Sequence, residues 1–197
     1  MTKQYHRARR DLRLWLTALT ATLVLTGAAV SVTQSQTQSG ATKNFGRINE
    51  NYFRGSQPTV DEYARLKQLG IKTVVDLRID SEPGEPERVL GLGMQYFNIP
   101  LKASKPASEE QTAYFLKLVN DPQNWPVYVH CKGGRHRTGA LTAVYRITHD
   151  NWTADQAWEE MKSYDFDQGL FGGPKAQKKF VYSFYQRRAA PTAATQK

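Results

Sequence analysis

Residues 129–139, VHCKGGRHRTG, decide the fold because they join a predicted strand to a predicted helix. They hold the only cysteine of the chain, between a β-branched run and a cluster of glycines and cations. The preceding run VYVH (127–130) is short and rich in strand-forming residues, so it predicts a buried strand. The segment that follows, TGALTAVYRITHD (138–150), has the apolar spacing of a helix. The expected apolar face of that helix consists of Ala140, Leu141, Val144, Ile147 and Thr148. The sequence therefore predicts a strand, a seven-residue loop and a helix in succession.

The loop has the composition of an anion-binding cradle. Gly133 and Gly134 permit backbone angles that a Cβ atom would forbid, so the amides of the loop and of the next helix can point inward. Such a field lowers the pKa of a cysteine from about 8.5 to about 3.5–7.5, and we expect Cys131 to be a thiolate at neutral pH. Arg137 can fold back and bind two oxygens of an oxyanion, while the Thr138 hydroxyl can cap the helix and bind the sulfur. Together these features indicate a nucleophilic sulfur that faces a phosphate.

Three simpler interpretations of the loop explain less. A buried, inert cysteine is the commoner case, but it leaves the glycines and Arg137 without a purpose. A nucleotide-binding P-loop would end in Gly-Lys-Ser/Thr, which is missing here. A zinc site is unfavourable because His130, Cys131 and His136 are too close in sequence to form a tetrahedral set alone.

The rest of the chain alternates between strand and helix patterns, which predicts an α/β fold with a central, mostly parallel sheet flanked by helices. Expected strands are 52–57, 71–78, 94–100 and 127–130, and expected helices are 59–70, 86–93, 109–121, 138–150, 154–165 and 174–188. Capping boxes are expected at Thr59/Glu62, Ser108/Gln111 and Thr153/Gln156, and Gly70 is the expected end of its helix. Because ligands of such sheets bind beyond the carboxyl ends of the strands, the cysteine loop lies where a site is expected.

The N-terminal segment has a different composition. Residues 1–32 hold five Lys/Arg and one Asp, and the chain is uncharged from Leu14 to Lys43. This pattern predicts either a signal peptide or a membrane anchor spanning Leu14–Val32, with the rest exported to the periplasm or the extracellular space. We expect residues 33–44 to be a flexible linker, since they are polar and low in complexity.

A single domain is expected over residues 45–188, followed by a disordered tail at 189–197. Beyond residue 32 the chain has 22 basic and 17 acidic residues, a balance that suits an anionic ligand or a solvated surface. We expect no metal, no organic cofactor and no nucleic-acid partner, and the sequence leaves the oligomeric state open.

The loop resembles the Cys-x5-Arg-Ser/Thr signature of protein tyrosine and dual-specificity phosphatases, running from Cys131 to Arg137 and Thr138, with matching His130 and Gly134. The upstream stretch NENYFRGSQPTVDEYARLKQLGIKTVVDLR is similar to the opening of small bacterial and plant-fungal atypical dual-specificity phosphatases. A rhodanese-like sulfur transferase also places a cysteine in an anion-cradling loop, but the Arg-Thr pair and the upstream match favour the phosphatases. The resemblance implies a dual-specificity-phosphatase-like fold with the catalytic loop between a strand and a helix.

The resemblance also implies a mechanism of two displacements. Cys131 attacks phosphorus while Arg137 holds the oxygens, and water then hydrolyses the cysteinyl-phosphate as Thr138 assists the departing sulfur. His130 is expected to orient the cysteine rather than to act as a base. The expected substrate-binding positions are Lys132, Gly133, Gly134, Arg135 and His136.

One member of the family's machinery is missing from its usual place. The family supplies a general-acid aspartate from a loop after an earlier strand, but here that segment, NIPLKASKPAS (98–108), has no carboxylate. Candidate substitutes are Asp80, Glu82, Glu85, Asp165 and Asp167. A phenolate leaves with a pKa of about 10 and gains from an acid, whereas a phosphate, with a second pKa of about 6, barely needs one.

We therefore expect a phosphatase that hydrolyses phosphate monoesters of a phosphorylated protein, of the tyrosine or dual-specificity type. The alternative of the same fold is an inositol polyphosphate or pyrophosphate phosphatase, a substrate class that the resemblance associates with the plant-fungal group. An exported location argues against such a cytosolic substrate. An alternative of another class is a catalytically weak phosphate-binding module.

Overall fold

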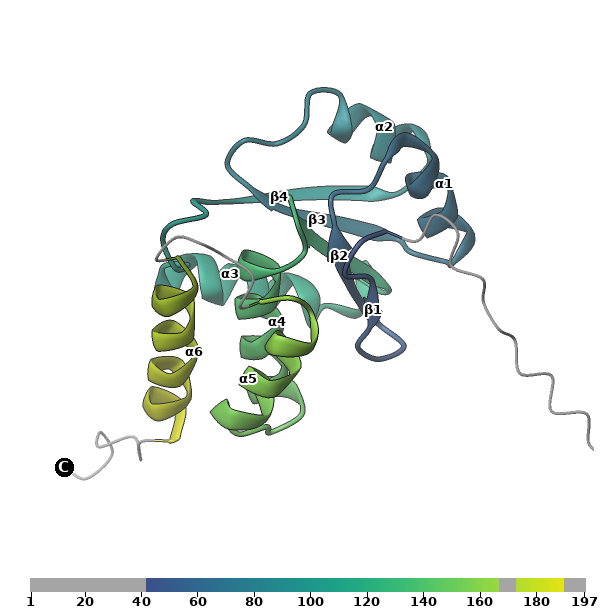
Figure 1. Cartoon of the computed structure of the whole chain (residues 1–197). Coiled ribbons are helices and arrows are strands. Elements are labelled where there is room, and N and C mark those ends of the chain that lie inside the picture. Colours follow the sequence, from purple (N-terminus) through teal and green to yellow (C-terminus); the bar gives the residue numbers. More distant parts are fainter. Residues whose placement is uncertain (1–41, 167–172, 190–197) are drawn as a thin grey trace, which may run out of the picture. The chain divides into compact units, whose positions relative to one another are not determined.

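The predicted alternation of strands and helices is confirmed in residues 42–166 and 173–189, the parts of the chain that the computed structural model describes (Figure 1). The expected signal or anchor, most of the expected linker and nearly all of the expected tail lie outside these residues. The elements in chain order are β1 (Gly46–Arg47), β2 (Tyr52–Ser56), α1 (Val60–Gln68), β3 (Thr73–Arg78), α2 (Glu85–Gly91), β4 (Gln95–Leu101), α3 (Glu109–Val119), the 3-10 helix η1 (Pro122–Asn124), β5 (Val127–Cys131), α4 (His136–His149), α5 (Ala154–Ser163) and α6 (Gly173–Ala189).

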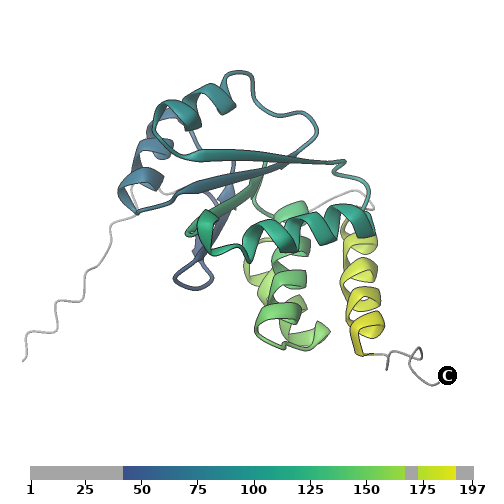
Figure 2. The ribbon, with the colours of Figure 1, turned by 180° about the vertical axis from the view of Figure 1, so that it is seen from behind.

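The strands form one sheet in the order β1-β2-β5-β3-β4. Strands β2, β5, β3 and β4 are parallel, and only β1 pairs antiparallel, with β2. Helices α1 and α2 lie on one side of the sheet, and α3 and α4 lie on the other (Figures 1 and 2). This arrangement confirms the expected α/β architecture with a mostly parallel sheet flanked by helices.

Local sequence signals set the helix boundaries as expected. All three capping boxes form, at the starts of α1, α3 and α5. Gly70 follows α1 with a φ of +84°, a conformation that favours glycine. The reciprocal hydrogen bonds of the capping boxes satisfy backbone donors that the first turn of a helix would otherwise leave unpaired.

Helix α4 differs from its prediction in two ways. It begins at His136 rather than Thr138, and it is buried on nearly every side instead of along one apolar face. Leu141 and Tyr145 pack in the core beside the sheet, whereas Ala143 and Ile147 pack in a second core with α5 and α6. The expected apolar face was too narrow because α4 lies between the sheet and a further layer of helices. A helix in such a position is apolar on most of its sides.

Residues expected in the linker belong to the folded unit. Thr42 is buried, Lys43 accepts a 2.8 Å hydrogen bond from the Ser56 amide, and the Asn44 side chain donates to the Gly133 carbonyl. The ordered chain therefore begins before the expected boundary at Phe45.

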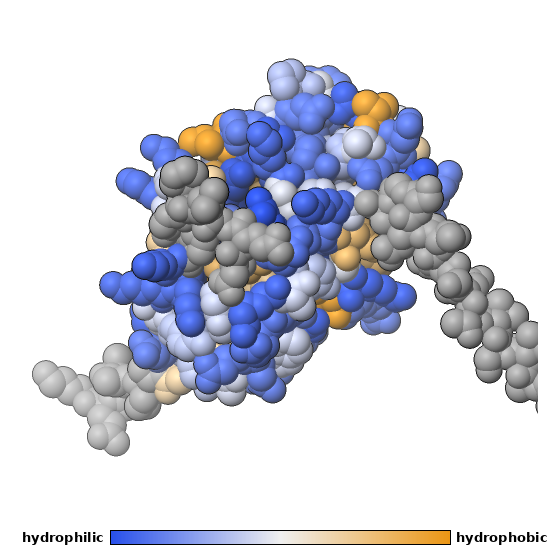
Figure 3. Space-filling view, viewed as in Figure 1, coloured by the Kyte–Doolittle hydropathy of each residue, from blue (hydrophilic) through white to orange (hydrophobic). Residues whose placement is uncertain are grey.

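The surface of the described residues shows few apolar side chains. On the face in Figure 3 hydrophilic residues dominate, and apolar residues form small separate patches. The large exposed apolar side chains are Val60, Leu69, Ile79, Leu90 and Tyr114. Scattered residues of this kind are normal on a soluble surface. No helix within the described ranges is both long and apolar enough to cross a membrane.

Candidate active site

The cysteine loop connects β5 to α4 at the carboxyl end of the parallel strands. Cys131 is the last residue of β5 and pairs in register with Ser56, the last residue of β2. One residue earlier, His130 pairs with Asp76 of β3. The loop is therefore surrounded by the ends of two neighbouring strands, in the position where parallel sheets bind ligands.

The carbonyl groups of the loop are bound from outside. The Asn44 side chain donates a 2.8 Å hydrogen bond to the Gly133 carbonyl, and the Arg54 guanidinium donates a short one to the Gly134 carbonyl. In a trans peptide the N–H points opposite to the C=O, so the amides of the same peptide units point to the inner side of the loop. The loop thus has the inward amides that the expected anion cradle would need, with Cys131 at its base.

Gly134 is a position that only glycine fits. Its φ is +66°, and a Cβ atom there would lie 2.5 Å from the carbonyl carbon of Gly55 and 2.6 Å from the Ser56 nitrogen. Both neighbours are backbone atoms of β2, which cannot move aside as a flexible side chain can. The loop is therefore in direct contact with strand β2.

Cys131 has the electrostatic surroundings of a thiolate. It is a free cysteine that is only 3% exposed. Burial by itself raises the pKa of the thiol, but the Arg137 guanidinium, the Thr138 hydroxyl and the amides of Thr138 and Gly134 outweigh it and lower the pKa below its usual value. The buried Thr138 hydroxyl acts on the sulfur through proximity, since it makes no well-aligned hydrogen bond among the described residues.

Arg137 is held from two sides at the inner end of the loop. Its Nη1 donates a 3.0 Å hydrogen bond to the carbonyl of Leu101, at the end of β4, and lies 3.7 Å from Oδ1 of Asp80. The side chain is almost fully buried. These contacts fix the orientation of the guanidinium, which would lower the entropy lost on binding an anion.

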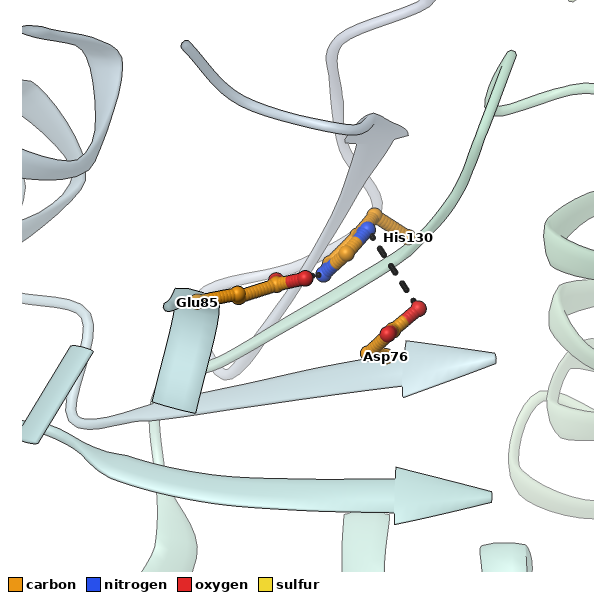
Figure 4. A group of neighbouring side chains, drawn as sticks. All are labelled: Asp76, Glu85 and His130. Carbon is orange, nitrogen blue, oxygen red and sulfur yellow. Dashed lines mark ion pairs between the residues drawn. The ribbon is translucent and has the colours of Figure 1, made fainter. Parts of the chain in front are cut away.

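His130 points away from the loop into a buried polar cluster (Figure 4). Its Nε2 lies 2.8 Å from Oε1 of Glu85, at ion-pair distance but without the alignment of a full hydrogen bond, and its Nδ1 lies 3.9 Å from Oδ1 of Asp76. Glu85 also accepts a 2.6 Å hydrogen bond from the Tyr63 hydroxyl. Burial alone would raise the pKa of Glu85, but His130 and Tyr63 lower it, so this carboxyl group is ionised. The buried ring suits a role in orienting the cysteine strand.

The donor atoms of Asp76, Glu85 and His130 lie within 4.8 Å of one another, which is close enough for a metal ion. However, the protein already supplies donors to the carboxylates. Asp76 accepts hydrogen bonds from the Ser81 hydroxyl and the Arg78 amide, and Glu85 accepts one from Tyr63. By contrast, both ring nitrogens of His130 and Oε2 of Glu85 are buried without a hydrogen-bond partner among the described residues.

The other expected substrate-binding residues are placed unequally. Lys132 is exposed, and Arg135 is half-buried at the start of α4. His136 is turned toward Phe166, with a ring nitrogen 2.8 Å from the Phe166 carbonyl and the rings in edge-to-face contact at 5.1 Å. His136 therefore contacts the segment after α5, whereas Lys132 is free to reach solvent beside the cradle.

The structure distinguishes among the candidate acids. Asp80 is the one with an ion pair to Arg137, and its side chain is 64% exposed. Its own backbone amide, together with Arg78 and Arg137, holds the pKa of the Asp80 carboxyl below its usual value. Glu85 is buried against His130, and Glu82 is exposed in the loop before α2. Asp165 follows α5 with a φ of +58°, and Asp167 lies outside the described residues.

Sequence reasoning missed several residues that contact the loop or its supporting histidine. Asn44 was assigned to a linker, Arg54 was read only as part of a strand, and Asp76 was not considered. A signal existed for two of them. Both Arg54 and Asp76 are charged residues inside runs that read as fully buried strands, and buried charges in such runs are rare without a specific partner.

Comparisons with known proteins agree with the geometry. A family model described as "DSP-PTPase phosphatase fused to NAD+ Kinase" matches residues 26–181. The dual specificity protein phosphatase TpbA of Pseudomonas aeruginosa is 30% identical over 166 residues, covering 79% of this chain and 73% of that protein. Inositol diphosphatase DSP2 of Oryza sativa subsp. japonica is 31% identical over 128 residues. This match covers 61% of each protein, so the chain spans less than two thirds of the length of the rice relative.

The fold also matches a solved structure. A P. aeruginosa TpbA variant in complex with pTyr superposes with a TM-score of 0.59 at 22% identity, covering 75% of this chain and 91% of that chain. The chain belongs to the family of DSP-PTPase phosphatases, within the cysteine-dependent dual-specificity phosphatase superfamily.

Proposed function

We propose that the protein hydrolyses phosphate monoesters through a cysteinyl-phosphate intermediate. The observation that carries this proposal is the environment of Cys131, a buried sulfur whose pKa is lowered by Arg137, Thr138 and two backbone amides. A buried thiol without such neighbours stays protonated and inert. The family membership and the activities of the relatives support the same function.

The proposed reaction has two displacements. In the first, the Cys131 thiolate attacks phosphorus, an S–P bond forms, and the bond between phosphorus and the leaving oxygen breaks with its electron pair on that oxygen. In the second, a water oxygen attacks phosphorus, the S–P bond breaks, and its electron pair returns to the sulfur as the water proton is released. Arg137 and the inward amides stabilise the charge on the phosphoryl oxygens in both steps. Thr138 stabilises the thiolate as it departs.

The pKa of the leaving group bears on the choice between two substrate classes. The carboxylate nearest to Arg137 among the described residues is Asp80, and its lowered pKa means that it carries no proton near neutral pH. We therefore place Asp80 as an anionic partner of Arg137 rather than as the acid. Without an acid, leaving groups of low pKa react best, which favours a pyrophosphate, whose leaving group is itself a phosphate, over a tyrosine phosphate.

The exposed lysines beside the loop and the two relatives do not all favour the same substrate class. Lys102, directly after the Leu101 carbonyl that binds Arg137, and Lys132 are both exposed, so extra phosphates could be bound near the cradle. The rice relative is an inositol diphosphatase, whereas the TpbA relative has been solved with phosphotyrosine. A phosphorylated protein is our main proposal because TpbA is matched over more of both chains.

The experiment is a series of aryl phosphates with leaving groups of increasing pKa, assayed on the full chain beside a phosphotyrosine peptide, inositol hexakisphosphate and an inositol pyrophosphate. Hydrolysis that Cys131→Ser abolishes supports the proposed function. A steep fall in rate with leaving-group pKa supports the absence of an acid, and a flat dependence contradicts it. Phosphate binding without turnover by the unaltered chain would instead identify a phosphate-binding module.

We also propose that the protein is exported and either cleaved after, or anchored by, its N-terminal segment. The support is the basic residues 1–13 followed by the uncharged run from Leu14, a pattern that keeps the basic end cytoplasmic. Cell fractionation of the full chain tests this. Loss of the membrane or exported fraction on deletion of Leu14–Val32 is the expected result, and a cytoplasmic protein in both cases contradicts it.

A further inference from the structure

Arg54 is a buried cation with no carboxylate at ion-pair distance among the described residues. Its side chain lies on the central part of β2 and is 0% exposed. Within residues 42–166 and 173–189, Nε and Nη1 have no hydrogen-bond partner, and no carboxylate lies at ion-pair distance. An unpaired buried charge is strongly unfavourable, so a charge kept in this position requires another anion nearby.

The contacts that Arg54 does make lead to the cysteine loop. Nη2 donates a short hydrogen bond to the carbonyl of Gly134. The guanidinium carbon lies 3.9 Å from the centre of the Tyr164 ring, which covers its other side. The next residue of the strand, Gly55, is in contact with Gly134 itself. Arg54 is thus fixed between the segment after α5 and the outer wall of the loop.

Three successive loop carbonyls are bound by residues that precede β3. The Gln57 amide donates to the Lys132 carbonyl at 3.4 Å, the Asn44 side chain to Gly133 at 2.8 Å, and Arg54 to Gly134. Because each peptide is planar and trans, the amides of residues 133, 134 and 135 point to the opposite side. The Gly134 amide indeed lowers the pKa of Cys131. Arg54 controls the last of these three peptides and so directs the Arg135 amide inward.

Charge couples Arg54 to the nucleophile as well. Burial lowers the pKa of Arg54, and the charges of Tyr52, Tyr164, Glu160 and Cys131 act in the opposite direction. Glu160 is already paired with Arg146 at 2.6 Å, and the pKa of both tyrosines is raised, so they stay neutral. Cys131 is therefore one of the groups whose negative charge stabilises the buried Arg54 cation.

We propose that Arg54 is a positioning residue of the active site, which holds the Gly134 carbonyl outward and places a second buried positive charge behind the Cys131 thiolate. Arg54 does not touch the substrate and acts through the loop. This role deepens the proposed phosphatase function and rests on it.

The test compares Arg54→Gln, which keeps an N–H donor but no charge, with Arg54→Lys, which keeps the charge. Arg47→Gln is the matched control, since Arg47 is an exposed arginine of the adjacent strand β1. The rate of Cys131 alkylation by iodoacetamide is measured in the full chain across pH, with and without inorganic phosphate. Because Cys131 is the single cysteine, the signal comes from one site. The titratable groups that face Cys131 are Arg137, Tyr128 and Arg54.

The expected result is a shift of the alkylation midpoint to higher pH by about one unit in Arg54→Gln, together with weaker protection by phosphate. Arg54→Lys restores the midpoint of the unaltered protein, and Arg47→Gln changes neither quantity. A merely structural role would lower the thermal stability of both Arg54 variants without separating their midpoints. An unchanged midpoint and unchanged phosphate protection in a folded Arg54→Gln variant would overturn the proposal.

If Arg54→Gln does not fold, Arg54→Lys decides alone, because a raised midpoint in that charged variant also overturns the role of the charge. Alkylation and phosphate protection require no turnover. A failure of the phosphatase function would appear as absent hydrolysis in the unaltered chain, whereas a failure of this inference would appear only in the comparison of variants.

Discussion

Substitution of Gly134 by alanine tests the contact between the cysteine loop and strand β2. The left-handed conformation at φ +66° costs a residue with a Cβ atom about 1–2 kcal/mol. The added atom would also lie 2.5 Å from the backbone of Gly55, and overpacking of this kind costs about 1–3 kcal/mol. The expected loss of stability is therefore about 2–5 kcal/mol in total.

Gly70 provides the matched control. Its φ is +84°, and an added Cβ would meet nothing within 4 Å, so Gly70→Ala carries the backbone cost without the clash. Urea denaturation followed by tryptophan fluorescence gives the free energy of unfolding of both variants. We expect Gly134→Ala to be the less stable by about 1–3 kcal/mol and to lose about a hundredfold in aryl phosphatase rate, since a misplaced loop misaligns the sulfur. Equal stability losses, with full activity in Gly134→Ala, would refute the close seating of the loop on β2.

Three further predictions concern the surroundings of the nucleophile. Thr138→Val removes a group that lowers the Cys131 pKa, so this pKa is expected to rise. The loss of activity on acidification, which marks protonation of the thiolate, then begins at a higher pH. An unchanged pH–rate profile contradicts this. Glu85→Gln removes the buried carboxylate beside His130 and is expected to cost about 1–3 kcal/mol in urea denaturation, against almost none for the exposed Glu82→Gln. Asn44→Gly keeps the φ of +55° available while removing the donor to the loop, so the aryl phosphatase rate falls about fivefold; a full rate argues against that hydrogen bond.

Local signals explain what could be predicted from the sequence. The three capping boxes depend on residues three positions apart, and all three form. The nucleophile, the arginine and the threonine fall within eight consecutive residues, from Cys131 to Thr138, so their proximity follows from the loop itself. The strand and helix patterns around them are equally local. These features need no knowledge of which strands are neighbours.

The contacts of the supporting residues could not be predicted because they depend on the strand order. Asn44 and Arg54 meet the loop from 89 and 80 positions away, and they do so because β2 pairs with β5 in the sheet. Glu85 reaches His130 because α2 covers the same side of the sheet as that ring. Of the apolar face expected for α4, Ala140, Leu141, Val144 and Ile147 are buried. The burial of its other sides could not be predicted, since the packing of α5 and α6 on its outer side is not visible in its own sequence.

The most direct test of covalent catalysis is to trap the intermediate. The full chain is mixed with an aryl phosphate, quenched in acid within the first turnover, and digested for mass spectrometry. We predict a phosphate on the peptide that contains Cys131, its absence in Cys131→Ser, and its accumulation in Thr138→Val, where departure of the sulfur is slowed. Sustained turnover with no phosphate on Cys131, or with phosphate on another residue, would contradict the proposed mechanism.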